Sequence, residues 1–397
     1  MNILYIITSD SDLNNYRAKK VFELNNHFDK VVVIAKSGSS SKNVIVTGAY
    51  PNPFSLLKRI GMSKLKTKFE KFSYFPDRGI LFIKKAFRRI IEIIEHEDMN
   101  SRIILLCFTP PHINAFLGYK IKNKFPHSRL IIDWQDLWTY DEYHLQKTAI
   151  MFHKRLRKLE LKIFKTADVN VVTNEFAADT LIHTFGIPTT KVVPIYHPFD
   201  RSELFENMKY KSHPQIRFGF LGHIIKPPKV QFDIVLTALN YCSNNGIDIE
   251  LNIYGDEQKV TRDFINSKKV NFVKLHKRRS HIESINNLMT NNYLILNLED
   301  LSNTKIIMHG KLSHYLMLKI PIIAFVPTNS FVAELIRRTG AGFIIDNKAK
   351  AGKCLLDIIN NFNYNDYLNG RKEKEIEKFS WGKISQDWLN IFSTVID

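Results

Sequence analysis

The sequence predicts an α/β protein built from two doubly wound domains, each with a mostly parallel sheet. Three observations support this prediction. Short β-branched, apolar runs alternate with helical stretches along the whole chain. The 397 residues are too many for one ordinary core and suit two domains of roughly 200 residues each. The alternation pauses once, at residues 196–215, where two prolines and mixed charge interrupt it without a clear strand.

The predicted strands fall into two groups on either side of this pause. Several are continuous apolar runs, as expected for parallel strands that are covered on both faces. The first group is Ile3–Ile7, Lys30–Ala35, Ile103–Phe108, Leu130–Asp133, Val169–Thr173 and Val192–Ile195. The second group is Ile216–Leu221, Ile249–Tyr254, Val270–Leu275, Tyr293–Leu298, Pro321–Phe325 and Gly342–Ile345. Helices such as Met151–Thr166 and Gln231–Asn245 supply the crossover connections.

We therefore expect an N-terminal domain over residues 1–205 and a C-terminal domain over residues 206–363. Residues 364–397 are helical, rich in Lys and Glu, and expected to return toward the N-terminal domain. Two such domains facing each other leave a central cleft at the carboxyl ends of both sheets, where ligands of this fold class bind.

The composition indicates a protein of a reducing compartment. The three cysteines, Cys107, Cys242 and Cys354, are far apart and have no metal-binding spacing. The N-terminal apolar run is too short for a signal peptide and suits a first strand. The longest stretch without formal charge, 103–119, contains two adjacent prolines and cannot cross a bilayer as a helix. We expect a cytoplasmic protein, either free or peripheral at the inner face of the cell membrane.

The net charge of +18 is concentrated in residues 54–90. This segment contains only two acidic residues, Glu70 and Asp77. Its eleven basic residues are Lys58, Arg59, Lys64, Lys66, Lys68, Lys71, Arg78, Lys84, Lys85, Arg88 and Arg89. Apolar and aromatic residues are interleaved, which suits an anionic membrane surface. A solvated helix face explains the pattern equally well. Nucleic acid is less favoured, because no zinc-finger, RRM-type or helix-turn-helix pattern accompanies the charge.

Polar and cationic residues follow the predicted strands of the C-terminal domain. Gly222 and His223 follow the first strand with Lys226 and Lys229 close behind, an arrangement that could cradle a pyrophosphate. The next three strands end in Gly255 and Asp256, in His276 and Lys277, and in Glu299 and Asp300. Ser280 and Glu283 form a predicted capping box. Each residue alone has an ordinary turn or cap explanation, and only their convergence at one edge favours a ligand site.

The stretch "IIMHGKLSHYLMLKIPIIAF", residues 306–325, carries the strongest signal. Gly310 and Lys311 are placed at the start of a predicted helix, with His314 and Tyr315 one turn further along. A lysine is disfavoured at that end of a helix unless an anion binds there, where free N–H groups and the helix dipole attract negative charge. A solvated Lys311 and a hydrogen-bonded structural His314 remain the ordinary alternatives.

Signals in the N-terminal domain are fewer. Asp10 and Asp12 follow the first strand, where helix capping is a simpler explanation than a metal site. His112 follows a Pro-Pro break and is expected to point into the cleft. In "IIDWQDLWTYDEY", Asp133, Asp136 and Trp138 combine carboxylates with aromatic rings, which suits sugar binding or acid–base chemistry. Capping carboxylates over a partly buried tryptophan pair are the equal alternative.

Taken together, these segments resemble the GT-B-fold glycosyltransferases, in particular glycosyltransferase family 4 and relatives in bacterial surface-polysaccharide synthesis. The resemblance covers nearly the whole chain. It is carried by "FTPPHINAFLGYKIKNKFPHSRLIIDWQDLWT", "RLRKLELKIFKTADVNVVTNE", "FGFLGHI", "LNIYGD", "HGKLSHYLMLKIPIIAF" and "FSWGKISQDWL" in that order. The resemblance implies two Rossmann-like domains, of which the C-terminal one binds the nucleotide-sugar donor and the N-terminal one the acceptor.

The resemblance also implies retaining transfer to a glycan or lipid-linked acceptor, with no cofactor and no required metal. On this basis the donor-binding residues are Gly222, His223, Lys226, Lys229, Gly255, Asp256, His276, Lys277, Glu299, Gly310, Lys311, His314 and Tyr315. Asp136 and His112 are the catalytic candidates, and Asp10, Asp133 and Trp138 are the acceptor-binding candidates.

The sequence departs from the family pattern at two places. His314 occupies a position where the family usually has a glutamate that binds the ribose hydroxyls, and "SDSDLNN" replaces an N-terminal Gly-Gly loop. Two alternative functions therefore stay open. One is a nucleotide-sugar 2-epimerase on the same fold, and the other is a non-catalytic scaffold with a degraded donor site.

Overall fold

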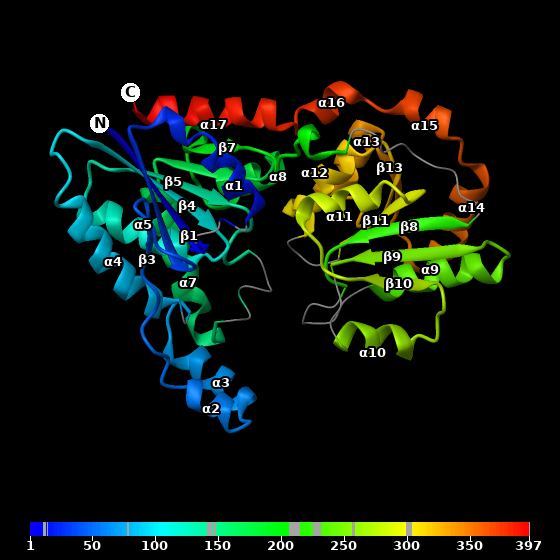
Figure 1. Ribbon diagram of the computed structural model, residues 1–397, viewed down its shortest axis with the longest axis horizontal. Coiled ribbons are helices and arrows are strands. Elements are labelled where there is room, and N and C mark those ends of the chain that lie inside the picture. Colours follow the sequence, from blue (N-terminus) through cyan, green and yellow to red (C-terminus); the bar gives the residue numbers. More distant parts are fainter. Residues whose placement is uncertain are drawn as a thin grey trace. The chain divides into compact units, whose positions relative to one another are not determined.

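The computed structural model describes residues 1–397 except 11–12, 14, 78, 141–144, 146–147, 206–214, 225–231, 256–258, 299–303 and 397. The chain divides into two compact units. Unit 1 comprises Met1–Tyr196 together with Ser385–Asp397, and unit 2 comprises His197–Ile384. Each unit contains one parallel sheet with helices on its faces (Figure 1).

The sheet of unit 1 has seven strands in the order β3-β2-β1-β4-β5-β6-β7, and all neighbouring pairs are parallel. The chain winds outward from β1 to β3, returns to β4 beside β1, and then winds the other way. The strands are β1 Asn2–Asp10, β2 Lys30–Ser37, β3 Val44–Val46, β4 Arg102–Thr109, β5 Arg129–Trp134, β6 Val169–Val172 and β7 Val192–Pro194.

The sheet of unit 2 has six parallel strands in the order β10-β9-β8-β11-β12-β13. Its order reverses between β8 and β11, and ligands of doubly wound sheets bind outside the carboxyl ends of the strands at such a reversal. The strands are β8 Ile216–Leu221, β9 Ile249–Tyr254, β10 Val273–His276, β11 Tyr293–Asn297, β12 Ile322–Phe325 and β13 Gly342–Ile345.

The helices connect successive strands and cover the sheets. Those of unit 1 are α1 Tyr16–Phe22, α2 Ser55–Arg59, α3 Ser63–Ser73, α4 Ile80–Ile94, α5 Ile113–Lys124, α7 Ile150–Thr166 and α8 Glu175–Asp179. Those of unit 2 are η4 Arg201–Glu203, α9 Phe232–Asn244, α10 Lys259–Ser267, α11 His281–Leu288, α12 Gly310–Met317, α13 Phe331–Thr339, α14 Ala351–Asn361, α15 Tyr364–Gly370 and α16 Glu373–Glu377. The last helix, α17 Trp381–Ile396, lies largely in unit 1.

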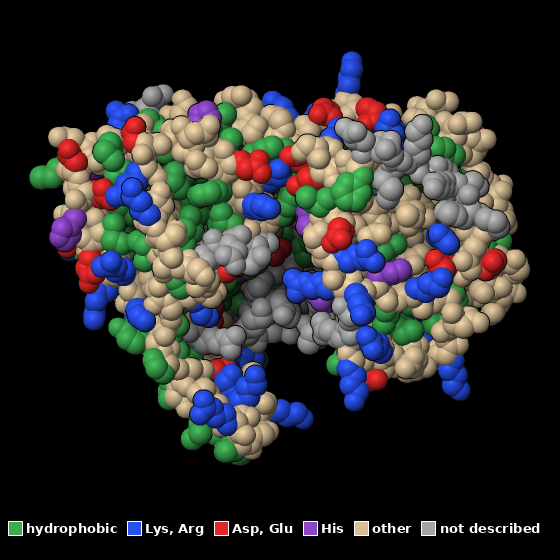
Figure 2. Space-filling model, viewed as in Figure 1, with side chains coloured by type: hydrophobic (Ala, Val, Ile, Leu, Met, Phe, Trp, Pro, Cys, Tyr) green, Lys and Arg blue, Asp and Glu red, His purple; other side chains and the backbone are tan. Residues whose placement is uncertain are grey.

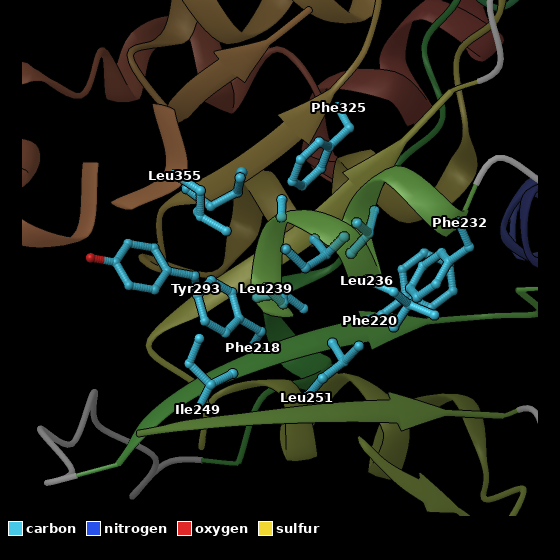
Figure 3. Close-up of a cluster of buried hydrophobic side chains, with 14 of the residues drawn as sticks. Phe218, Phe220, Phe232, Leu236, Leu239, Ile249, Leu251, Tyr293, Phe325 and Leu355 are labelled. Carbon is cyan, nitrogen blue, oxygen red and sulfur yellow. The ribbon is translucent and has the colours of Figure 1, made fainter. Parts of the chain in front are cut away.

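Buried apolar side chains join the helices to the sheet in unit 2 (Figure 3). Phe218 and Phe220 of β8 are 0% and 1% exposed, and they belong to one buried cluster with side chains of α9 and α14 such as Leu239 and Leu355. The ring of Phe220 meets that of Phe232 edge to face, with ring centroids 4.9 Å apart. Phe218 stacks on Tyr293 of β11 at 5.3 Å. This aromatic core fixes β8, the strand whose end carries the candidate site.

In unit 1 the last helix completes the core. Trp388 of α17 is fully buried and packs against Phe108 of β4, with ring centroids 6.4 Å apart. Phe392 meets Phe28 edge to face at 5.0 Å. Side chains from the C-terminal helix therefore belong to the same core as the first strands.

The structure confirms the predicted α/β class with two doubly wound, Rossmann-like sheets. Every predicted strand is present, and those at 216–221, 249–254 and 342–345 have the predicted bounds. The capping box of Ser280 and Glu283 is also present. The short edge strand β3 was not predicted, because its three residues follow the Ser-rich segment 37–41 and none of them is fully buried. Within the described residues, no helix has the length and apolar character needed to cross a membrane.

Candidate functional site

The start of α12 is attached to the end of β8. Lys311 Nζ donates a hydrogen bond to the carbonyl oxygen of Leu221 at 3.2 Å, and it lies over the Phe220 ring, 3.8 Å from its centroid. Tyr315, one turn later, accepts a hydrogen bond from the Leu221 backbone N–H at 2.9 Å. Burial raises the pKa of the Tyr315 hydroxyl, so this group stays neutral. The lysine at the helix start is thus held at the sheet reversal, next to Gly222.

Two glycines open the neighbouring strand ends. Gly222 after β8 has φ +112° and Gly255 after β9 has φ +94°, a backbone conformation that favours glycine. Among the described residues, no atom lies within 4 Å of the Cβ that another residue would place at either position. The Gly222 N–H donates to the carbonyl oxygen of Tyr254 at 2.9 Å, which fixes one turn beside the other. As far as the described residues go, both turns therefore leave space over the carboxyl edge of the sheet.

His276 at the end of β10 belongs to the wall of this edge. Its ring stacks on Tyr254 with centroids 4.6 Å apart, and its Nε2 lies 2.6 Å from Asn252 Oδ1. Burial and the nearby positive charge of Arg279 lower the pKa of His276, so the ring is neutral near pH 7. Lys277 and His223 are exposed. Lys277 thus adds an exposed cation beyond the neutral His276 ring.

His314 is buried and faces His281 of α11, with ring centroids 4.6 Å apart. Burial, reinforced by electrostatic repulsion from His281 and His197, holds the pKa of His314 well below its ordinary value. The side chain at this position, for which the sequence resemblance implied a glutamate, is therefore a neutral imidazole close to two other histidines.

In unit 1, His112 is also buried. It stacks on Trp138 with ring centroids 5.5 Å apart, and its Nε2 lies 2.8 Å from the Asp136 carbonyl oxygen. Trp138 is 2% exposed, whereas Asp136 is half-buried. Asp10 is half-buried at the end of β1. The roles predicted for Asp136, Asp10 and His112 stay predictions. Trp138 has too little exposed surface to stack on a sugar without rearrangement.

Asp133 forms a buried ion pair that was not predicted. Both of its carboxylate oxygens accept from Arg17 Nε, at 3.0 and 2.8 Å, and the two side chains are 0% and 1% exposed. Arg17 Nη1 also donates to the carbonyl oxygens of Ile195 and Tyr196, and its guanidinium lies 5.5 Å from the centroid of Trp388. These contacts give Asp133 a structural partner, and its predicted contact with an acceptor stays a prediction.

Glu160 of α7 is a second buried carboxyl group. It accepts hydrogen bonds from the Thr139 backbone N–H at 3.1 and 3.2 Å and from the Thr139 hydroxyl. Burial raises the pKa of Glu160 to about 7, although the hydrogen bonds from Thr139 oppose the change. Glu160 therefore anchors the segment that carries Asp136 and Trp138, and it titrates near neutral pH.

This pKa makes the stability of unit 1 depend on pH. Because the pKa in the folded protein lies above the ordinary value of 4.5, Glu160 favours folding most below about pH 4.5. That contribution is lost as the pH rises through about 7. Between pH 5 and pH 8 we expect the wild type to lose about 2–3 kcal/mol of unfolding free energy relative to Glu160→Gln. Urea unfolding across this range measures the difference.

The control for this prediction is Glu92→Gln, which removes a carboxylate whose side chain is 50% exposed. It should follow the wild type at every pH. If the stability difference between Glu160→Gln and the wild type does not change with pH, Glu160 is ionised throughout the range and the prediction is wrong.

The structure thus brings Gly222, Gly255, Lys311 and Tyr315 together at one edge of the unit 2 sheet, with His276 along the same edge. Four predicted donor-binding residues, Lys226, Lys229, Asp256 and Glu299, lie outside the described residues. Sequence reasoning missed Arg17 and Glu160. A carboxylate within the apolar run "LIIDW" was a signal that Asp133 requires a buried cation, but nothing in the sequence identifies Arg17 as that cation.

The sheets and their strand orders define the GT-B fold, which solved structures share over nearly the whole chain. The HepE protein of Anabaena, solved with UDP and glucose, superposes with a TM-score of 0.66 at 14% identity, covering 99% of this chain and 100% of that one. Sucrose-phosphate synthase of Thermosynechococcus elongatus has a TM-score of 0.68 at 10% identity, with 100% and 99% covered.

A structure from Listeria monocytogenes that is assigned as a UDP-N-acetylglucosamine 2-epimerase has a TM-score of 0.59 at 13% identity, covering 100% of this chain and 96% of that one. No protein-family model and no curated protein sequence matches the chain. At these identities the similarity establishes the fold alone. The similar structures include transferases as well as an epimerase.

Proposed function

We propose that this protein is a glycosyltransferase. It would move a sugar from a nucleoside-diphosphate donor to a glycan or lipid-linked acceptor in bacterial polysaccharide synthesis. The observation that carries the proposal is the position of Lys311, at the start of α12 and against the end of β8. A cation and the positive end of a helix dipole at a sheet reversal suit a diphosphate. The complexes of HepE with UDP and with UDP-glucose are consistent with such a donor.

The proposed chemistry is retaining transfer without a divalent metal at the diphosphate. As the bond from sugar to diphosphate breaks, negative charge develops on the departing phosphate oxygens. Lys311 and the positive end of the α12 dipole would stabilise that charge. The side chain of Asp136 in unit 1 is the proposed carboxylate on the acceptor side, with His112 buried behind it.

Binding of sugar nucleotides tests the proposal directly. We expect isothermal titration calorimetry to detect binding of at least one UDP-linked or GDP-linked sugar. The corresponding nucleoside monophosphate should bind at least tenfold more weakly, because the proposed contacts are to the diphosphate. Incubation with the bound donor and an acceptor should release nucleoside diphosphate. Release of a 2-epimer of the sugar instead would establish the epimerase alternative. If no nucleotide gives a binding heat, both the glycosyltransferase and the epimerase are excluded, and the non-catalytic scaffold is the remaining function.

We also propose that α2 and α3 bind an anionic membrane surface. Exposed apolar side chains gather there, with Leu56 and Ile60 at 61% and 60% exposure and Phe69 and Phe72 at 45% and 52%. Exposed basic side chains lie among them, namely Lys58, Arg59, Lys64 and Lys68. Figure 2 shows both kinds over the projection formed by α2 and α3. Such a surface suits the interface of an anionic bilayer, with about 1 kcal/mol for each basic residue near it.

Vesicle sedimentation tests this surface. We expect the protein to sediment with phosphatidylglycerol-containing vesicles and to stay in solution with purely zwitterionic ones. Phe69→Ser/Phe72→Ser and Lys64→Glu/Lys68→Glu should each lower the bound fraction severalfold. Lys348→Glu/Lys353→Glu makes the same charge change at exposed lysines of unit 2 and should bind as the wild type does. If both double-lysine variants lose the same fraction of vesicle binding, binding depends on the net charge of the protein and not on a surface formed by α2 and α3.

A further inference from the structure

Three side chains with metal-ligating atoms converge in unit 2 from separate segments. Glu203 lies in η4, His281 is the first residue of α11, and His314 lies in α12. Their candidate ligand atoms all lie within 4.8 Å of one another. We refer to these three residues as the His–His–Glu cluster.

Contacts outside the cluster hold each of the three backbones in place. The buried Asn286 side chain of α11 donates to the Glu203 carbonyl oxygen at 2.9 Å and accepts from the Phe205 N–H at 2.8 Å. The capping box of Ser280 fixes the start of α11 and so the backbone of His281. The hydrogen bonds of α12 to Leu221 fix the helix that carries His314. The cluster is therefore preorganised by the fold.

The chemistry of the three groups matches a metal site. His314 is 4% exposed, and a neutral imidazole carries a nitrogen lone pair that can bind a metal. Glu203 is 13% exposed and supplies a negative charge, with its Oε2 3.7 Å from His281 Nε2. Two imidazoles and one carboxylate form a common zinc ligand set, which leaves a fourth position for water.

We propose that Glu203, His281 and His314 bind a zinc ion. Ligand atoms of a tetrahedral zinc site lie about 3.4 Å apart, given bond lengths of about 2.1 Å. Separations in the cluster therefore need to shorten by up to about 1.4 Å, through rotations of the Glu203 and His281 side chains. Because the N-terminal turn of α11 disfavours a cation, the carboxylate of Glu203 is essential to the site.

The ion would connect three segments that are far apart in the chain. It would tie residues 201–203 to the start of α11 and to His314 of α12, the helix that also carries Lys311. This inference goes beyond the proposed glycosyl transfer and does not depend on it. The zinc is a resident ion that supports α12, distinct from a divalent metal that would act on the diphosphate.

Zinc titration of the full-length, metal-stripped protein without nucleotide tests the site. We expect one Zn²⁺ per chain by calorimetry, and a Co²⁺-substituted protein with the visible absorption of a tetrahedral ion. His281→Ala and Glu203→Gln should each weaken zinc binding at least tenfold and abolish the cobalt absorption. His281 is 38% exposed, so its replacement is expected to leave the protein folded, as thermal unfolding of the apoprotein can verify.

The matched control is His127→Ala, which removes an exposed histidine of unit 1 and should leave zinc binding unchanged. Equal zinc affinity in the wild type and in both cluster variants would overturn the site and assign the three residues to an ordinary ion pair packed on a buried histidine. Failure to bind a sugar nucleotide would not affect this result, because the titration contains none.

Discussion

Replacement of Arg17 by methionine is expected to destabilise the protein by about 3–5 kcal/mol, because it leaves the Asp133 carboxylate buried without a counter-charge. Asp133 is fully buried, and the two bonds from Arg17 Nε together with a 3.4 Å contact from Gln135 are its side-chain hydrogen bonds among the described residues. Burial raises the pKa of Asp133 and the charge of Arg17 opposes that change. The variant will have to protonate Asp133 or unfold. Urea unfolding measures the loss.

A double-mutant cycle separates the ion pair from the packing of the arginine side chain. Arg17→Met/Asp133→Asn removes both charges and should recover a substantial part of the stability lost in Arg17→Met. The control Arg89→Met breaks the pair of Arg89 with Glu92, whose side chains are 58% and 50% exposed, and should cost less than about 1 kcal/mol. If Arg17→Met and Arg89→Met have the same unfolding free energy, the buried ion pair contributes no more to stability than the exposed one, and the prediction is wrong.

Replacement of Lys311 by alanine is expected to have the largest effect on activity. If Lys311 contacts the diphosphate, its loss should lower donor affinity about tenfold or more and the transfer rate about 100-fold. The larger effect on rate follows because charge on the departing phosphate grows as the bond breaks. Calorimetry with the bound sugar nucleotide and single-turnover release of nucleoside diphosphate measure the two effects separately.

Lys319→Ala is the matched control, because it removes an exposed lysine just after the same helix. It should bind and transfer as the wild type does. The Lys311 variant also loses a hydrogen bond to Leu221 and a contact with the Phe220 ring, so its thermal unfolding must be measured in parallel. A folded Lys311→Ala protein with unchanged affinity and rate would remove this residue from the site and with it the main support for the proposed function.

The sheets could be predicted because their strands are continuous apolar runs, such as Ile3–Ile7, whose residues are at most 1% exposed. The grouping of Gly222 and Lys311 could also be predicted, because the carboxyl ends of parallel strands meet at one edge. In both cases local sequence decides the structure, and the topology of the fold then places residues that are about 90 positions apart side by side.

Pairings between side chains on non-neighbouring elements could not be predicted. Arg17 lies 116 positions before Asp133, and Glu203, His281 and His314 come from three separate segments. Sequence patterns report which face of an element is buried, but not which buried polar groups will meet. For the same reason the sequence left the burial of Trp138 open and did not predict that of His112, since an aromatic residue beside carboxylates is compatible with an exposed sugar platform or with a packed core.

The position of Trp388 bears on how the protein can be divided. An expression fragment that ends at residue 196 would contain every strand of the first sheet, but it would lack Trp388. The Phe108 ring and the Arg17 guanidinium, which both pack against the Trp388 indole, would then lose this contact. The exposed apolar surface would favour aggregation. Separate production of the two halves therefore requires the terminal helix to be supplied to the first half, through a short fusion or as an added peptide.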